Sequence, residues 1–133
     1  KLDADPVIIP EYENTTSMCL SNNGKFLLVN ISRGDTSGRV RLWDLEKSRL
    51  VREYSGHKQS TYVIRSCFGS ANFSLIATGS EDCSVYIYQR QTAQLLAKLD
   101  GHVGVVNSVV WSPIDNEMMA SASDDNTVRI WAV

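Results

Sequence analysis

The sequence contains few of the residues that mark the less common classes of protein. Only 3 of its 133 residues are proline and 8 are glycine, while 43% are apolar, so a low-complexity or disordered chain is excluded. No apolar run approaches the roughly 20 residues that a membrane-spanning helix needs. Residues 1–6 lack the basic and apolar regions of a signal peptide. These absences predict one ordinary globular domain in the cytoplasm or nucleus, with no membrane partner.

Cysteine and positive charge are also scarce. Cys19, Cys67 and Cys83 are an odd number with no Cys-x-x-Cys spacing, so neither a disulfide framework nor a zinc site is predicted. The 13 Lys and Arg residues against 15 Asp and Glu residues give a net charge of −2. The chain therefore lacks the basic footprint with which proteins bind the nucleic-acid backbone. We expect no nucleic-acid partner, no metal and no cofactor.

An internal repeat fills the chain. Residues 50–57 align without gaps with residues 95–102, and each stretch ends in Gly-His, 45 residues apart. Residues 77–88 align with residues 120–131 at a distance of 43, and residues 38–44 match the end of that block. The repeat divides the chain into three units with a period of about 44 residues. The predicted units are 11–56, 57–101 and 102–133, the last without an outer strand.

Alternation of apolar and polar residues within each unit predicts short β-strands. Val128 and Ile130 alternate with Arg129, for example, and stretches rich in Gly, Asn, Asp and Pro separate the strands. These turns leave no room for helices. We therefore predict an all-β fold with about four short antiparallel strands in each unit.

The spacing of the repeated residues resembles that of the WD40 repeat family. Each Gly-His pair is followed, after 25 or 23 residues, by the Asp of a Ser-x-Asp sequence, and six residues later by Tyr88 or Trp131. The resemblance implies a β-propeller, in which four-stranded antiparallel blades surround a channel. Three units imply about three blades, which is a partial propeller.

The repeated polar residues predict a buried hydrogen-bonded relay in each of the last two units. A His, a Ser, an Asp and an aromatic side chain with a donor group can satisfy one another, which avoids about 1–3 kcal/mol for each unpaired buried group. The first unit lacks the Gly-His pair and the Asp, so we expect packing alone to hold it. The predicted relay residues are His57, Ser80, Asp82 and Tyr88 in the second unit, and His102, Ser123, Asp125 and Trp131 in the third.

Repetition argues against catalysis by these residues. A Ser, a His and an Asp can form a hydrolase site, which is an alternative of another functional class. A catalytic set is normally assembled once, however, whereas these residues recur at matching spacing. Histidines in adjacent blades also lie too far apart to share one metal ion. We predict a structural role for the relay residues and no enzymatic activity.

Six residues are candidates for binding another protein. They lie near the start of the second unit or in the turn before the third strand of a unit, positions that a propeller places at the channel mouth or on the rim. Tyr and Arg are favoured at binding hot spots, and acidic residues attract basic ligands. Ordinary packing and solvation are the alternative. The candidates are Lys58, Gln59, Tyr62, Arg65, Glu81 and Asp124.

Three stretches, residues 62–68, 79–82 and 118–125, resemble the last blades of the WD-repeat subunit of GID/CTLH ubiquitin-ligase complexes. That family has a helical LisH and CTLH region ahead of its propeller, and this sequence contains none of it. The resemblance implies a non-catalytic scaffold that recruits substrates or supports assembly of a ubiquitin ligase. A scaffold in trafficking or RNA-processing complexes is an alternative.

Three blades are fewer than the four to eight of a typical closed propeller. We therefore expect a C-terminal piece of a longer propeller, whose open faces are covered by further blades, by a second copy or by another chain. Residues 7–9 are predicted to form an outermost strand that completes a blade in trans or within a larger ring.

Overall fold

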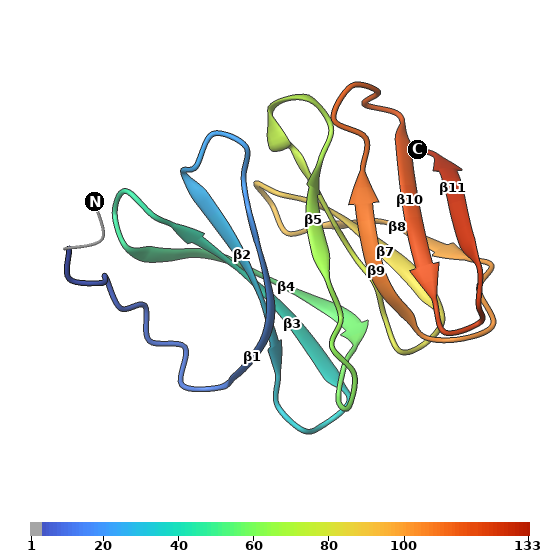
Figure 1. The fold of residues 1–133 in the computed structure, drawn as a ribbon, viewed down its shortest axis with the longest axis horizontal. Coiled ribbons are helices and arrows are strands. Elements are labelled where there is room, and N and C mark those ends of the chain that lie inside the picture. The colour runs from blue at the N-terminus through green and yellow to red at the C-terminus, as the bar shows by residue number, and fades with distance from the viewer. Residues whose placement is uncertain (1–3) are drawn as a thin grey trace.

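The computed structural model describes residues 4–133, whose strands form three antiparallel sheets (Figure 1). The first sheet contains β1 (Asn14–Leu20), β2 (Phe26–Ser32), β3 (Ser37–Asp44) and β4 (Arg49–Lys58). The second contains β5 (Ser66–Gly69), β6 (Leu75–Thr78), β7 (Ser84–Gln89) and β8 (Leu95–Asp100). The third contains β9 (Val106–Trp111), β10 (Met118–Ser123) and β11 (Val128–Ala132). Strands that are consecutive in sequence pair within each sheet, so the predicted all-β partial propeller is confirmed.

Helical structure in residues 4–133 is limited to one 3-10 turn, Ala71–Phe73. No helix in this part of the chain is long and apolar enough to cross a membrane. Residues 7–9 form no strand within this chain, and their predicted pairing in trans or within a larger ring stays a prediction. Ile9 instead packs on Val29, Ile31 and Trp43, on the face of the first sheet. A sheet face offers no free backbone groups for pairing, because these groups point along the plane of the sheet.

The core lies in two layers between successive sheets. The inner strands β1, β5 and β9 are neighbours, and β5 contacts both of the others. β7 is buried on both faces: Tyr86 and Tyr88 belong to the core with the first sheet, while Val85 and Ile87 belong to the core with the third. The alternation of aromatic and aliphatic residues in β7 therefore reflects two apolar environments and not one buried and one solvated face.

Close approach of the second and third sheets depends on glycine. A Cβ atom at Gly69 would lie 2.2 Å from Cε3 of Trp111, so the indole ring can rest on the β5 backbone only where that atom is missing. A Cβ atom at Gly79 would lie 2.1 Å from the carbonyl oxygen of Val106. These two glycines allow β9 to pack directly against the second sheet.

Candidate functional site

The third sheet contains a complete hydrogen-bonded relay. Nδ1 of His102 lies 2.7 Å from Oδ2 of Asp125, and Nε2 of His102 lies 2.8 Å from Oγ of Ser121. Nε1 of Trp131 donates to the same Oγ at 2.8 Å. A carboxylate accepts only and an indole donates only, so a neutral imidazole with its proton on Nδ1 satisfies all four side chains. The relay links the loop before β9 to β10, β11 and the turn between them.

The hydroxyl in this relay belongs to Ser121 and not, as the sequence predicted, to Ser123. Side chains two residues apart in a strand share a face, so both serines were possible. In the observed register Ser121 pairs with Arg129, two positions from Trp131. Ser123 lies at the end of β10, where its Oγ accepts from the backbone N–H of Asp125 and donates to the carbonyl oxygen of Gly104.

Asp125 is the most heavily hydrogen-bonded residue of the relay. Besides His102, its carboxylate accepts the backbone N–H groups of Val103 and Thr127 and the Thr127 hydroxyl. The Thr127 and His102 hydrogen bonds hold the pKa of the Asp125 carboxyl well below its usual range. Asp125 thus fixes both the turn before β11 and the orientation of the imidazole.

Only one link of the predicted relay of the second unit forms, between Tyr88 and His57. Tyr86 OH donates to Oδ2 of Asp82 at 2.5 Å, and Lys98 Nζ lies 3.4 Å from the same oxygen, so this carboxylate is engaged away from His57. Tyr88 OH donates to the carbonyl oxygen of Ser55 at 2.9 Å and lies 3.4 Å from Nδ1 of His57. Tyr86 occupies the position in the second sheet that Arg129 occupies in the third. Its hydroxyl donates the hydrogen bond that the Asp82 carboxylate accepts.

Ser80 stays outside any relay in the second sheet, as Ser123 does in the third. Its Oγ accepts the backbone N–H of Lys58 at 2.9 Å. Both serines of the Ser-x-Asp sequences therefore bind backbone groups of the segment that enters their own blade. The register position of Ser121 is taken by Thr78, whose hydroxyl donates to the carbonyl oxygen of Gly79.

His57 is consequently a buried histidine with an incomplete set of partners. It is 1% exposed, and its Nε2 has no hydrogen-bond partner among the described residues. Its ring lies against Gly38, where a Cβ atom would be 2.4 Å from the imidazole. Burial, with a smaller contribution from the charge of Arg39, lowers the pKa of His57 from 6.5 to about 4.

The first sheet has a charged substitute for the relay, which corrects the expectation that packing alone holds it. The register position of Ser121 is Val29 here, so no hydroxyl is available to Trp43. Nε1 of Trp43 instead donates to the carboxylate of Glu11, which also pairs with Arg41. Arg41 in turn pairs with Glu53 at 2.9 Å. Glu11 was missed because it lies outside any strand, and only the path of the segment before β1 brings it to Trp43.

Four of the six candidate partner-binding residues are exposed at one end of the sheets. Lys58 ends β4, Tyr62 and Arg65 lie in the loop before β5, and Asp124 lies in the turn between β10 and β11. These segments lie at the lower ends of the sheets in Figure 1. Tyr62 is 47% exposed, and Asp124 accepts a hydrogen bond from the Asn107 amide. We call Lys58, Tyr62, Arg65 and Asp124 the lower surface.

Gln59 and Glu81 make hydrogen bonds within the chain and are not available to bind a partner protein, which corrects the prediction for these two residues. Gln59 is fully buried, and its amide donates to the Thr16 hydroxyl and the Tyr62 carbonyl oxygen. The Glu81 carboxylate accepts the backbone N–H groups of Ser60, Thr61 and Tyr62. Burial by itself would raise the pKa of Glu81, but the hydrogen bonds from these donors lower it below its usual value. Glu81 was predicted to point outward, but it clamps the loop that presents Tyr62.

Replacing Glu81 with alanine is expected to release this loop while leaving the sheets folded. Three backbone N–H groups lose their acceptor, so the amides of residues 60–62 should exchange with solvent at least about tenfold faster. Hydrogen exchange measured by NMR checks this. The exchange rates in Glu81→Gln, which keeps an acceptor oxygen, should lie between those of the parent chain and those of Glu81→Ala. Unchanged exchange in Glu81→Ala would contradict the clamp.

Among residues 4–133 no group of three or more His, Cys, Asp or Glu residues is arranged to hold a metal ion. The geometry is that of stacked sheets tied by side chains at the blade entries, with a polar surface at one end. A model of the WD domain, G-beta repeat (WD40), matches residues 48–89 and 93–132. The chain belongs to the WD40 repeat family.

Individual relatives extend this similarity over nearly the whole chain. It is 47% identical over 127 residues to the WD repeat-containing protein 26 homolog of Arabidopsis thaliana, which covers 95% of this chain and 21% of the relative. It is 47% identical over 117 residues to GID complex subunit 7 of Schizosaccharomyces pombe, covering 88% and 22%. The Drosophila melanogaster WD repeat-containing protein 26 homolog is 42% identical over 124 residues, covering 93% and 19%. The chain thus spans about a fifth of the length of these relatives.

Proposed function

We propose that this chain is a non-catalytic, protein-binding part of a WD-repeat scaffold in a ubiquitin-ligase assembly of the cytoplasm or nucleus. The observation that supports it most is the 47% identity, over 88% of the chain, to a protein named as a subunit of the GID complex. WD40 repeat proteins generally act as scaffolds, and the lower surface offers Tyr62 and Arg65, two residue types that dominate binding energies.

The burial of the relay supports a bracing role over hydrolysis. Ser121 is 2% exposed and His102 is 6% exposed, so a substrate has no access to the hydroxyl or to the imidazole beside it. A nucleophile must reach the reacting carbon, which requires an open cleft at the serine. The relay therefore suits a scaffold whose surface is held rigid from within.

Protein partners are also supported by an uncovered apolar face. Val110, Val128 and Ile130 of the third sheet are 58%, 68% and 66% exposed. Apolar patches on a sheet face are normally buried against another unit. We propose that further blades of a propeller cover this face in the assembled protein.

Exchanging charge on the lower surface tests the proposed function. Tagged chain is expressed in cells, and co-purified ubiquitin-ligase subunits are quantified by mass spectrometry. We expect these subunits to be enriched, and Arg65→Glu to lower their recovery at least about tenfold, because a hot-spot side chain contributes about 2 kcal/mol or more. Lys47→Glu makes the same charge change at an exposed position outside the lower surface and should have no effect. Absence of ligase subunits, or equal recovery with both variants, would refute the proposal.

A further inference from the structure

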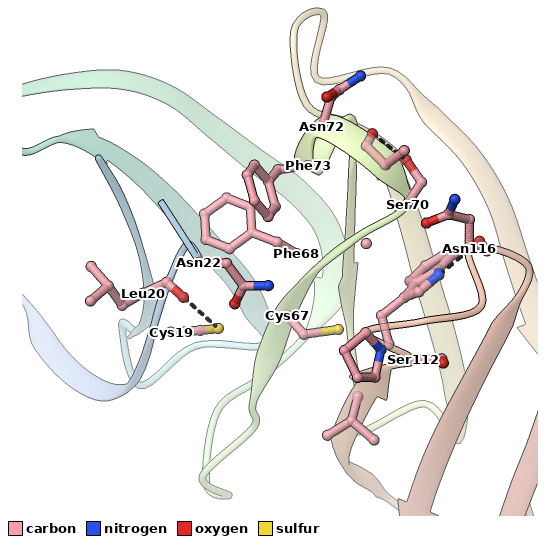
Figure 2. A pocket seen from close by; sticks show the side chains of 15 residues that line it. Cys19, Leu20, Asn22, Cys67, Phe68, Ser70, Asn72, Phe73, Ser112 and Asn116 are labelled. Atoms are coloured by element: carbon pink, nitrogen blue, oxygen red, sulfur yellow. Dashed lines mark hydrogen bonds between the residues drawn. The ribbon is translucent and has the colours of Figure 1, made fainter. Parts of the chain in front are cut away.

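A pocket of about 480 Å³ lies between the inner strands of all three sheets, at the end opposite the lower surface (Figures 1 and 2). It is bounded by the end of β1, by β5 with the 3-10 turn after it, and by the end of β9 with the following loop. Neither the relay nor the lower surface includes any residue of this pocket.

Phe68, Phe73 and Trp111 line the pocket together with serine and asparagine side chains, and none of its lining residues is charged. Phe68 and Phe73 meet edge to face, with ring centroids 6.1 Å apart. Trp111 also lines the pocket, and its Nε1 already donates to the carbonyl oxygen of Asn116. An ionic ligand would lose its hydration there with no counter-charge in return. The pocket therefore favours an uncharged ligand with an apolar group.

Side-chain amides at the rim supply the polar specificity. Asn22 and Asn116 line the pocket, and in Figure 2 no hydrogen bond joins either side-chain amide to the other residues drawn. The amide of Asn22 points toward Cys67, and that of Asn116 lies toward Ser70. A carboxamide has one acceptor and two donors, which match the N–H and C=O groups of a peptide unit. Two free carboxamides on different elements can pair with separate peptide groups of one extended segment.

The rim between these amides is built from strained backbone. Ser70, Asn72 and Phe73 adopt left-handed φ angles of 62°, 61° and 55°, which side chains with a Cβ rarely accept. Such strain costs about 1–3 kcal/mol per residue and concentrates at ligand-binding loops. Here it turns Phe73 toward Phe68 and closes the aromatic wall.

We propose that this pocket binds a short, uncharged, extended peptide segment of a partner protein. An aliphatic side chain of the segment lies between the phenylalanine pair and Trp111, and its backbone pairs with Asn22 and Asn116. This site is separate from the lower surface and does not depend on the proposed function. Peptide groups are chosen over other neutral ligands because the free polar groups are carboxamides from two different sheets.

Titration of the chain with acetyl-Ala-Leu-Ala-amide, followed by backbone NMR, tests the proposal. We expect saturable shifts confined to the amides of residues 19–22, 67–73 and 110–116. The Glu and Lys analogues of the central residue should bind at least about tenfold more weakly, because their charge is desolvated without a partner. Shifts spread over other surfaces, equal binding of the three peptides or tighter binding of glucose, a neutral non-peptide probe, would overturn the proposal.

Two variants and a matched control separate specific binding from unspecific contact. Asn22→Ala and Asn116→Ala each remove an amide that the fold does not use, and each should weaken the Leu peptide about tenfold. Asn14→Ala removes an exposed amide at the opposite end of β1 and should leave the affinity unchanged. An unchanged spectrum outside the pocket verifies the fold of each variant. Wild-type affinity in both pocket variants would refute the assigned contacts.

Discussion

Replacing His102 with alanine is expected to destabilise the folded chain by about 2–4 kcal/mol. The imidazole joins Asp125 to Ser121, and its removal leaves a buried hydroxyl and a carboxylate without their shared partner. Little water can enter to replace it, because the His102 side chain is 1% exposed. Urea unfolding monitored by circular dichroism measures the loss.

A double-mutant cycle distinguishes the relay from a general packing effect. Ser121→Ala alone should cost about 1–3 kcal/mol, and its combination with His102→Ala should cost clearly less than the sum, because the two side chains bind each other. Ser123→Ala is the matched control, since its hydroxyl binds only backbone groups near the relay, and its effect should add to that of His102→Ala. If the losses of Ser121→Ala and His102→Ala add up in the double variant, the hydrogen bond between the two side chains does not contribute to stability.

Lowering the pH from 7 to 5 is expected to remove about 2 kcal/mol of stability through His57 alone. Its pKa is 6.5 in the unfolded chain and about 4 in the folded chain. Between these values the unfolded chain binds the proton and the folded chain does not, so acid favours unfolding. The contribution is complete above pH 6.5 and is lost as the pH falls toward 4. Urea unfolding at half-unit pH intervals measures how the free energy of unfolding changes with pH.

Between pH 7 and pH 5 the loss of stability through His57 can be measured apart from the loss through the carboxylates. Asp82 and Glu81 have depressed pKa values and unfolded-state values of 3.8 and 4.5, so their contributions are lost only at lower pH. A His57→Gln variant keeps a polar side chain of similar length but does not titrate. Its stability should therefore change between pH 7 and 5 by about 2 kcal/mol less than that of the parent chain. Equal slopes in the two proteins would show that His57 titrates normally.

The two histidines show how far the repeat could predict the site. Both follow glycine, both are buried, and both enter a blade at the predicted position. His102 meets Asp125 because the side chain opposite Ser121 is Arg129, which leaves that carboxylate free. His57 does not meet Asp82 because a tyrosine occupies the equivalent place. Thr78 in place of Ser121 and Tyr88 in place of Trp131 are further differences between the two sheets.

The rim residues show the same limit. Glu81 and Asp124 occupy equivalent turns and are chemically alike, so the sequence predicted one outward role for both. The loop of residues 60–62 turns three N–H groups toward Glu81, whereas Asp124 meets only the Asn107 amide and stays exposed. Backbone donors have no signature in the sequence, because every residue except proline has one.

The sequence by itself determined the all-β class and the short strands, because alternating residues separated by turns leave no room for helices. The partial propeller was implied by the resemblance of its repeat to the WD40 repeat. Only the tertiary structure decided which hydroxyl joins His102, how Glu11 replaces a relay in the first sheet and where the amides of the pocket converge. Those contacts join strands and loops whose relative register depends on packing between sheets. A register error of one residue would move each donor out of hydrogen-bond distance of its acceptor.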